Sequence, residues 1–224
     1  DLQKIFPAND TREKALTDTW TWETYLTSAQ KLHKAGVPVG NPMGQTSDAV
    51  DWVGALFRSY GVVMADEKDN IKVNSPETRA ALEYAKKLCA VMPPEIYAWD
   101  DAGNNRWLIS GKGSGIMNPP SAWAVAKRDN PKVAEQCWTH DMPKGPKGRF
   151  VGYLPFFWGI WSFSKNKQAA KDLLLHLSEK DQAHKFVNGS QGYDIPPFKS
   201  YYDFDIWKTE GPPAGSVYNY PPRG

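Results

Sequence analysis

Many catalytic, metal and cofactor-binding motifs contain histidine, cysteine or glycine at fixed spacings, and none of the three is arranged here in such a motif. His33, His140, His176 and His184 form neither an HExxH pair nor a Cys/His metal set. The chain contains no GxSxG motif, no Walker loop and no GxGxxG between a strand and a helix. The sequence therefore predicts no metal ion, no cofactor and no catalytic nucleophile.

Two short segments contain residues that occur in catalytic or phosphate-binding motifs, but their position in the sequence does not match those motifs. Segment 111–115 is rich in glycine, but it precedes an expected strand, whereas a phosphate-binding loop follows one. Asp100 and Asp101 are adjacent carboxylates of the kind that glycosidases use. Neighbours in sequence rarely reach one bond from opposite sides, so we interpret this pair as the start of a helix.

Charge and composition exclude several classes of partner. Lys and Arg number 27 against 25 Asp and Glu, and the signs are mixed along the chain, which makes nucleic acid and acidic membranes poor candidates. No apolar run approaches the ~20 residues that cross a bilayer. Ten Trp, ten Tyr and nine Phe favour a well-filled core and also suit aromatic contacts with a polar ligand. Cys89 and Cys137 indicate free thiols, although a disulfide between them stays open.

Apolar spacing predicts three helices in the first 93 residues. The first is capped by Thr21 and stopped by Gly36, the second follows residues 45–48 and ends at Gly61, and the third opens at 75–77. Their predicted buried residues are, in turn, Trp22, Tyr25, Leu26, Ala29 and Leu32; Val50, Val53, Phe57 and Tyr60; and Leu82, Ala85, Leu88 and Cys89.

The rest of the sequence predicts further helices that alternate with short strands. Short strands are predicted at 37–40 and 115–118, a hairpin-like excursion at 66–73, and helices at 102–110 and 122–128. Residues 141–149 read as a loop and 150–163 as an extended aromatic segment. A last helix is expected after Asn166 with one face formed by Ala170, Leu173, Leu174 and Leu177, and mostly irregular chain after Gly192. Helices that alternate with short strands favour an α/β fold.

Five segments, in this order along the chain, carry a resemblance to a known family. They are WTWETYL at 20–26, NNRWLISGKG at 104–113 with IMN at 116–118, PSAW at 120–123, WGIWSFSK at 158–165 and GYDIPP at 192–197. Together they resemble the extracellular solute-binding proteins of ABC-type carbohydrate importers, which include distant maltose-binding and glycerol-phosphate-binding relatives. The resemblance spans nearly all of the chain.

This resemblance implies a fold and a division of the chain. The expected fold is α/β, a periplasmic-binding-protein type II lobe with three layers, together with part of the other lobe. Residues 1–19 would be an irregular lead-in, residues 20–150 the ligand-binding lobe, and residues 151–224 the crossover strand and a partial return to the first lobe. Most of the first lobe would be missing, so the chain is expected to be a fragment.

The resemblance also implies a function and a set of contacts. Such proteins close two lobes over a sugar or polyol and deliver it to a membrane permease; they are monomers outside the cytoplasm, in the periplasm or the extracellular space, and they are not enzymes. Helix N-termini would offer backbone donors, short side chains would bind hydroxyls, and rings would cover sugar faces. The expected ligand-binding residues are Gln45, Thr46, Asp48, Asn118, Ser121, Trp123, Phe157, Trp158 and Gly159.

Two alternatives remain open at this level. A carbohydrate-active hydrolase on an α/β scaffold predicts two carboxylates that converge in a cleft at ~5–10 Å, one with a raised pKa. An interaction module that binds protein through the Tyr- and Pro-rich end of the chain predicts an exposed aromatic patch and no enclosed pocket.

Overall fold

The computed structural model describes residues 18–119, 121–137, 140–152 and 155–206. Its contacts divide the chain into two compact units, one formed by Asp1–Tyr153 with Pro213–Tyr218 and the other by Leu154–Pro212 with Asn219–Gly224. Each unit is described by itself.

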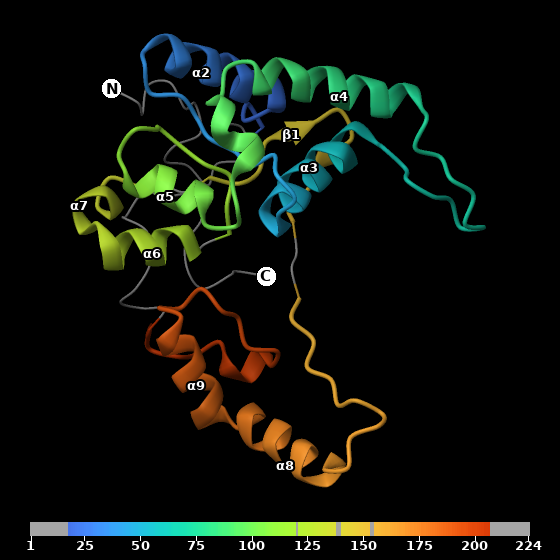
Figure 1. Cartoon of the computed structure of the whole chain (residues 1–224), viewed down its shortest axis with the longest axis vertical. Coiled ribbons are helices and arrows are strands. Elements are labelled where there is room, and N and C mark those ends of the chain that lie inside the picture. The colour runs from blue at the N-terminus through green and yellow to red at the C-terminus, as the bar shows by residue number, and fades with distance from the viewer. Residues whose placement is uncertain (1–17, 120, 138–139, 153–154, 207–224) are drawn as a thin grey trace. The chain divides into compact units, whose positions relative to one another are not determined.

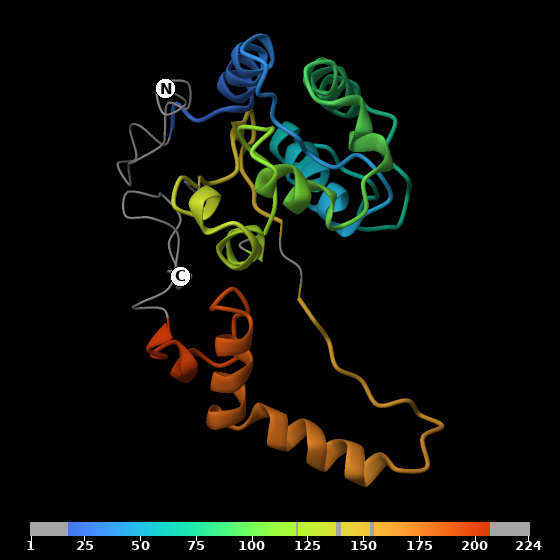
Figure 2. The same cartoon turned by 60° about the vertical axis from the view of Figure 1, so that its left-hand side comes forward.

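Helices α2 (Trp22–Lys34) and α4 (Pro76–Cys89) lie side by side in the first unit (Figure 1), and Figure 2 views both nearly along their axes. Thr21 and Thr24 form a capping box at the start of α2, and the Ser75 hydroxyl caps α4. All five residues predicted on the buried face of α2 are buried. The Tyr84 hydroxyl joins the helices by donating to the Trp22 carbonyl at 2.6 Å.

Helix α3 (Ser47–Tyr60) begins and ends where the sequence indicated, but its buried face is shifted from the predicted one, of which Val53 and Tyr60 still pack against the core. Gly61 closes it at φ 85°, a left-handed conformation that favours glycine. Val50, predicted to be buried, is 72% exposed. The Trp52 ring turns inward instead because its Nε1 donates to the Pro42 carbonyl at 2.7 Å. The buried residues of α3 are Ala49, Trp52, Ala55, Leu56 and Ser59.

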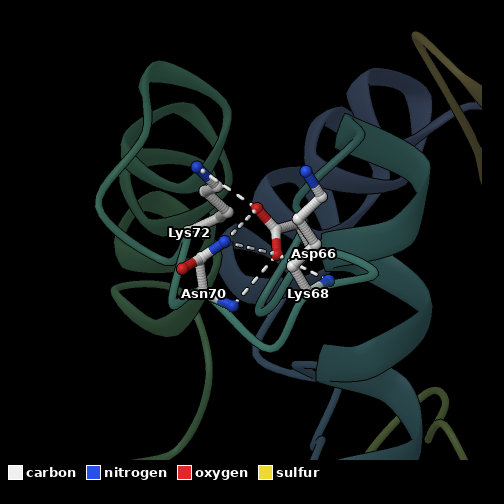
Figure 3. A network of polar contacts seen from close by, with 4 residues as sticks. All are labelled: Asp66, Lys68, Asn70 and Lys72. Carbon is white, nitrogen blue, oxygen red and sulfur yellow. Dashed lines mark hydrogen bonds and ion pairs between the residues drawn. The ribbon is translucent and has the colours of Figure 1, made fainter.

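The predicted excursion after α3 is confirmed as a turn around Asp66, shown in Figure 3. The backbone pairs antiparallel at Ala65 and Ile71. Between them, one carboxylate oxygen of Asp66 accepts from the backbone amides of Lys68 at 3.0 Å and Asn70 at 2.9 Å. The Lys72 ammonium lies 3.4 Å from the other oxygen. A local side chain therefore closes this loop.

The two predicted strands at 37–40 and 115–118 meet, but only through one isolated parallel bridge between Val39 and Gly115. The Gly40 amide donates to the Gly115 carbonyl at 2.9 Å. Beyond that point the side-chain oxygen of buried Asn41 accepts from the Met117 amide at 2.9 Å. A side chain thus replaces the next backbone acceptor, and the ladder stops.

Short helices complete the first unit. They are η2 (Pro94–Ala98), α5 (Gly103–Ile109), α6 (Ser121–Asp129) and α7 (Pro131–Ala134). The last three pack against one another (Figure 1). The predicted loop at 141–149 contains a hairpin of β1 (Lys144–Gly145) and β2 (Gly148–Arg149), which packs on α3.

The core of the first unit is aromatic at its centre. Trp22 and Tyr84 meet edge to face with ring centroids 5.6 Å apart, and the Trp22 Nε1 donates to the Ser59 hydroxyl at 2.6 Å. The fully buried side chains around them include Leu32, Val39, Trp52, Leu56, Leu88 and Ile96. This core joins α2, α3, α4 and η2 and supports the elements on which the candidate site lies.

The second unit contains α8 (Lys167–Ser178), α9 (Lys180–Gly189) and η3 (Lys199–Tyr201). Helix α8 follows Asn166 as predicted, but none of its residues is buried, and Leu175 is 70% exposed. Helix α9, which the sequence interpretation did not predict, buries Ala183 and Val187. Across all described residues, no helix combines the length and the apolar character needed to cross a membrane.

Candidate ligand-binding site

The fully buried amide of Asn104, on α5, joins three segments of the first unit. Its nitrogen donates to a carboxylate oxygen of Asp48 at 2.7 Å and contacts the side-chain oxygen of Asn118. Its oxygen accepts from the Asn105 amide at 2.8 Å. Two predicted site residues that lie 70 positions apart in sequence thus share one nitrogen as partner, and Asn104 fixes the start of α3 next to the segment that leads into α6.

The first turn of α3 uses most of its own backbone donors. The buried Thr46 hydroxyl accepts from the Ala49 amide at 3.1 Å, which makes Thr46 a capping residue. One oxygen of Asp101 accepts from the Ser47 hydroxyl at 2.9 Å and from the Asp48 amide at 3.4 Å. Free backbone donors were expected at this wall of the site; the Thr46 hydroxyl and the Asp101 carboxylate each accept from one of them instead.

Three carboxylates therefore lie around the start of α3. Burial raises the pKa of Asp48, the Asn104 amide opposes this effect, and the charges of Asp101 and Asp51 add to it. Burial also raises the pKa of Asp51. In the part of the chain that the structure describes, no Lys or Arg pairs with any of the three. The site is acidic and rich in hydrogen-bond acceptors.

Asn118 and Ser121 form the opposite part of the cluster, and both are half-buried. The Asn118 amide nitrogen donates to the Pro119 carbonyl at 2.8 Å and to the Ser121 hydroxyl at 3.3 Å. The Ser121 hydroxyl, as an acceptor in this contact, keeps its own hydrogen for a ligand. Gln45 is exposed just before α3 and has no polar partner among the described residues, so its amide is open to solvent.

Trp123 does not offer the flat ring that the sequence interpretation assigned to it. The side chain is only 9% exposed, on the buried face of α6. The Lys127 ammonium lies 5.3 Å from the ring centroid and covers one face. In this conformation Trp123 belongs to the packed face of α6.

The remaining predicted residues, Phe157, Trp158 and Gly159, belong to the second unit. Phe157 is 89% exposed, and Trp158 packs edge to face on Phe186 of α9 with centroids 5.9 Å apart. The structure thus groups Gln45, Thr46, Asp48, Asn118, Ser121 and Trp123 in one unit and these three residues in the other.

Two surface hollows of the first unit lie away from the predicted site. One, of about 440 Å³, is lined by residues of α4 with Met43 and Tyr97, and the other by residues 74–83. Neither includes a predicted ligand-binding residue. Among the described residues, no group of His, Cys, Asp and Glu is placed to hold a metal ion.

Sequence reasoning missed Asn104 and did not connect Asp51 with the site. A signal for Asn104 was present, because this polar residue stands four positions before Leu108 and so on the same helix face.

Comparisons with known proteins agree on one architecture. The sequence profile of bacterial extracellular solute-binding proteins matches residues 4–213. The fold is similar to that of the maltose-bound protein MalE3 of T. maritima, with a TM-score of 0.70, 21% identity, and 85% of this chain and 50% of that one covered. No curated protein matches the sequence significantly.

Two further solved structures show the same likeness. One is an ABC transporter solute-binding protein of Thermotoga lettingae bound to α-D-tagatose (TM-score 0.63, 17% identity, 84% and 48% covered). The other is a putative oligosaccharide periplasmic-binding protein of Synechococcus in complex with zinc (TM-score 0.59, 14% identity, 84% and 46% covered). The chain spans about half the length of each of these three proteins.

These likenesses confirm the α/β periplasmic-binding-protein fold that the sequence resemblance implied. The profile match covers most of the chain and is independent of the structure. The chain therefore belongs to the family of bacterial extracellular solute-binding proteins.

Proposed function

We propose that the protein to which this chain belongs binds a small carbohydrate or polyol and delivers it unchanged to an ABC-type permease. Residues 20–150 serve as the ligand-binding lobe, and residues 151–224 form the crossover and a partial return to the other lobe. The observation that carries the proposal is the polar cluster around Asn104, where Asp48, Asn118 and Ser121 from separate segments are held together.

The chemistry of this cluster suits a hydroxyl-rich ligand. Asp48 has one carboxylate oxygen that no described residue contacts, and the Ser121 hydroxyl has a free hydrogen. A sugar carries hydroxyls that both donate and accept, so it can donate to the carboxylate and accept from the serine hydroxyl. Two of the similar solved structures are bound to maltose and to tagatose, which supports the same ligand class here.

Delivery follows from closure of two lobes over the ligand, outside the cytoplasm, by a monomer. Closure is driven by a ligand that binds the closed state more tightly than the open one. The interaction-module alternative placed its patch in the Tyr- and Pro-rich end of the chain, of which 207–224 lie outside the described residues. Another set of aromatic residues, Phe156, Phe157, Trp161 and Phe163, is exposed. We assign their cover to the other half of the fold, since the chain spans about half of each similar structure.

The carboxylates favour binding over hydrolysis. Asp48 has a raised pKa and Asp101 lies beside it, as a hydrolase would require. However, Asp101 accepts hydrogen bonds from the Ser47 hydroxyl and from the backbone amide of Asp48, so both carboxyl groups lie at the same end of α3. A glycosidase needs its two carboxyl groups on opposite sides of the bond that it cleaves.

The test is calorimetry on the full-length natural protein with maltose, D-tagatose and D-sorbitol. We expect at least one to bind, Asp48→Asn to weaken its binding about tenfold, and Asp69→Asn to leave it unchanged. Asp69 is the matched control because it carries the same charge on the exposed excursion after α3. Mass spectrometry of the eluted ligand should recover it intact. Affinity that Asp48→Asn leaves unchanged would contradict the site, and a hydrolysed ligand would contradict the function.

A further inference from the structure

We propose that this site selects uncharged or amine-bearing sugars and rejects acidic ones such as uronates and sugar phosphates. The inference rests on the proposed function and names its substrate class more narrowly. It follows from an excess of acceptors over donors around the start of α3, and from the absence of a cation that offsets them among the described residues.

The excess of acceptors is visible atom by atom. Asn104 occupies one oxygen of Asp48, and Ser47 with the Asp48 amide occupies one oxygen of Asp101. The second oxygen of each carboxylate, and both oxygens of Asp51, receive no hydrogen bond from any described residue. Four carboxylate oxygens are thus open to donors. The Ser121 hydroxyl and the Gln45 amide are donors of the predicted site that have no acceptor among the described residues.

The basic residues on the neighbouring helices are directed to other partners. Arg106 of α5 pairs with Asp100 at 2.6 Å, and Arg128 of α6 pairs with Asp129 at 2.6 Å. Lys127 lies over the Trp123 ring.

In the hairpin, Lys144 pairs with Asp18 at 3.0 Å, and Arg149 donates to the Met142 carbonyl. Two other basic residues lie at the far end of α3. Arg58 is in its last turn, about 15 Å along the helix from Asp48. The Lys147 side chain packs beside Gly61, which closes the helix. Among the described residues of these segments, no Lys or Arg forms an ion pair with Asp48, Asp51 or Asp101.

Ligand chemistry follows from this balance. A carboxylate or phosphate on the sugar brings acceptors without donors and adds a like charge next to Asp48, Asp51 and Asp101. A hydroxyl donates to a carboxylate without a charge penalty, and an ammonium group forms a stronger, charge-assisted bond. The order of affinity should therefore be amine or neutral first and acid last.

The experiment is calorimetry on the full-length natural protein with matched sets of ligands. These are glucose, glucosamine, glucuronate and glucose 6-phosphate; galactose, galactosamine and galacturonate; and maltose with maltobionate. For each parent sugar that binds, we expect the acidic member to bind at least about tenfold more weakly and the amine at least equally well. Asp48→Asn and Asp51→Asn should reduce the difference in affinity between the parent sugar and its acidic member. Higher salt should also reduce it, whereas Asp69→Asn should not.

The outcomes separate the two proposals. An acidic member that binds as tightly as its parent overturns this inference and leaves the carbohydrate function standing. Binding by no member of any set, and by none of the three solutes named above, overturns both.

Discussion

The side-chain nitrogen of Asn104 donates to the carboxylate of Asp48 across 2.7 Å, although 56 positions separate the two residues in sequence. The contact joins the fully buried side chain of α5 to the half-buried first turn of α3. It places a carboxylate with a raised pKa beside the polar groups that precede α6. The proposed ligand contacts of the first unit therefore depend on a residue that need not touch the ligand.

Replacing Asn104 by aspartate tests this dependence. Asn104→Asp removes the donor and buries a second carboxylate against Asp48, so we expect the free energy of unfolding at pH 7 to fall by about 3 kcal/mol or more. The loss should shrink at low pH, where the two carboxyl groups can share a proton. Urea denaturation measures both effects.

Asn74→Asp is the control for that change. Asn74 is exposed and precedes the start of α4, so the same substitution should shift stability by no more than about 0.5 kcal/mol. Equal losses in the two variants would show that Asn104 does not organise the cluster.

The pKa shifts of Asp48 and Asp66 predict opposite responses to pH. Burial raises the pKa of Asp48, so its ionised form disfavours folding, and this penalty grows as pH rises above the ordinary value of 3.8. Hydrogen bonds from the Asn70 side chain and backbone lower the pKa of Asp66. Asp66 therefore contributes stability above its unfolded pKa, and this contribution is lost as pH falls through its folded pKa.

The variants Asp48→Asn and Asp66→Asn measure these slopes. Between pH 4 and pH 7, Asp48→Asn should gain stability relative to the natural protein as pH rises. Between pH 2 and pH 4, Asp66→Asn should lose relative stability as pH rises. Urea titrations at each pH provide the comparison, and slopes of the same sign would contradict the assigned causes.

Helix boundaries could be predicted from the sequence because their causes are local. Thr21 and Ser75 accept from amides three residues later, and Gly61 adopts the left-handed conformation that closes α3. Each of these signals lies within one turn of the helix end that it marks. No tertiary contact is needed to read them.

The buried face of a helix and the extent of strand pairing were harder to predict, because contacts with distant residues determine both. Val50 and Val53 indicated one face of α3. Val53 does pack against the core, but Val50 is exposed, and the buried face is centred on Trp52, whose Nε1 donates to the Pro42 carbonyl. Asn41 ends the strand pairing at residue 117 with its side chain. Trp52 and Asn41 bond to residues that lie 10 and 76 positions away in sequence. The periodicity of a short window does not reveal such partners.

For the candidate site, too, local signals could be read from the sequence and distant contacts could not. Asp48, Asn118 and Ser121 were chosen as residues near helix starts, and the structure brings them together around Asn104. Thr46 serves as a cap, which the local pattern equally allowed. The binding role of all these residues stays a prediction until a ligand is tested.

Close contact between Gly40 and two indole rings predicts a steric effect on stability. A Cβ at Gly40 would lie 2.7 Å from both Trp107 Cδ1 and Trp99 Cη2, and the rings themselves are packed with centroids 5.7 Å apart. Gly40→Ala should therefore lower the free energy of unfolding by about 1–3 kcal/mol.

Gly54 provides the opposite case on α3. A Cβ there would have no neighbour within 4 Å, and the residue lies inside a helix. Gly54→Ala should therefore raise the free energy of unfolding by about 0.5–1 kcal/mol. A thermal melt of both variants distinguishes crowding from a general effect of alanine, and a stabilised Gly40→Ala would contradict the packing described.

Truncation of Trp123 separates a packing role from a stacking role. Because the ring is 9% exposed and packs within α6, Trp123→Ala should lower the free energy of unfolding by about 3–5 kcal/mol. Trp123→Phe keeps most of the buried volume and should retain most of the stability, together with ligand affinity, because Ser121 stays in place. Urea denaturation and calorimetry on both variants test this together. A Trp123→Ala protein that keeps full stability but loses its ligand would instead show that the ring faces the ligand, as the sequence interpretation first indicated.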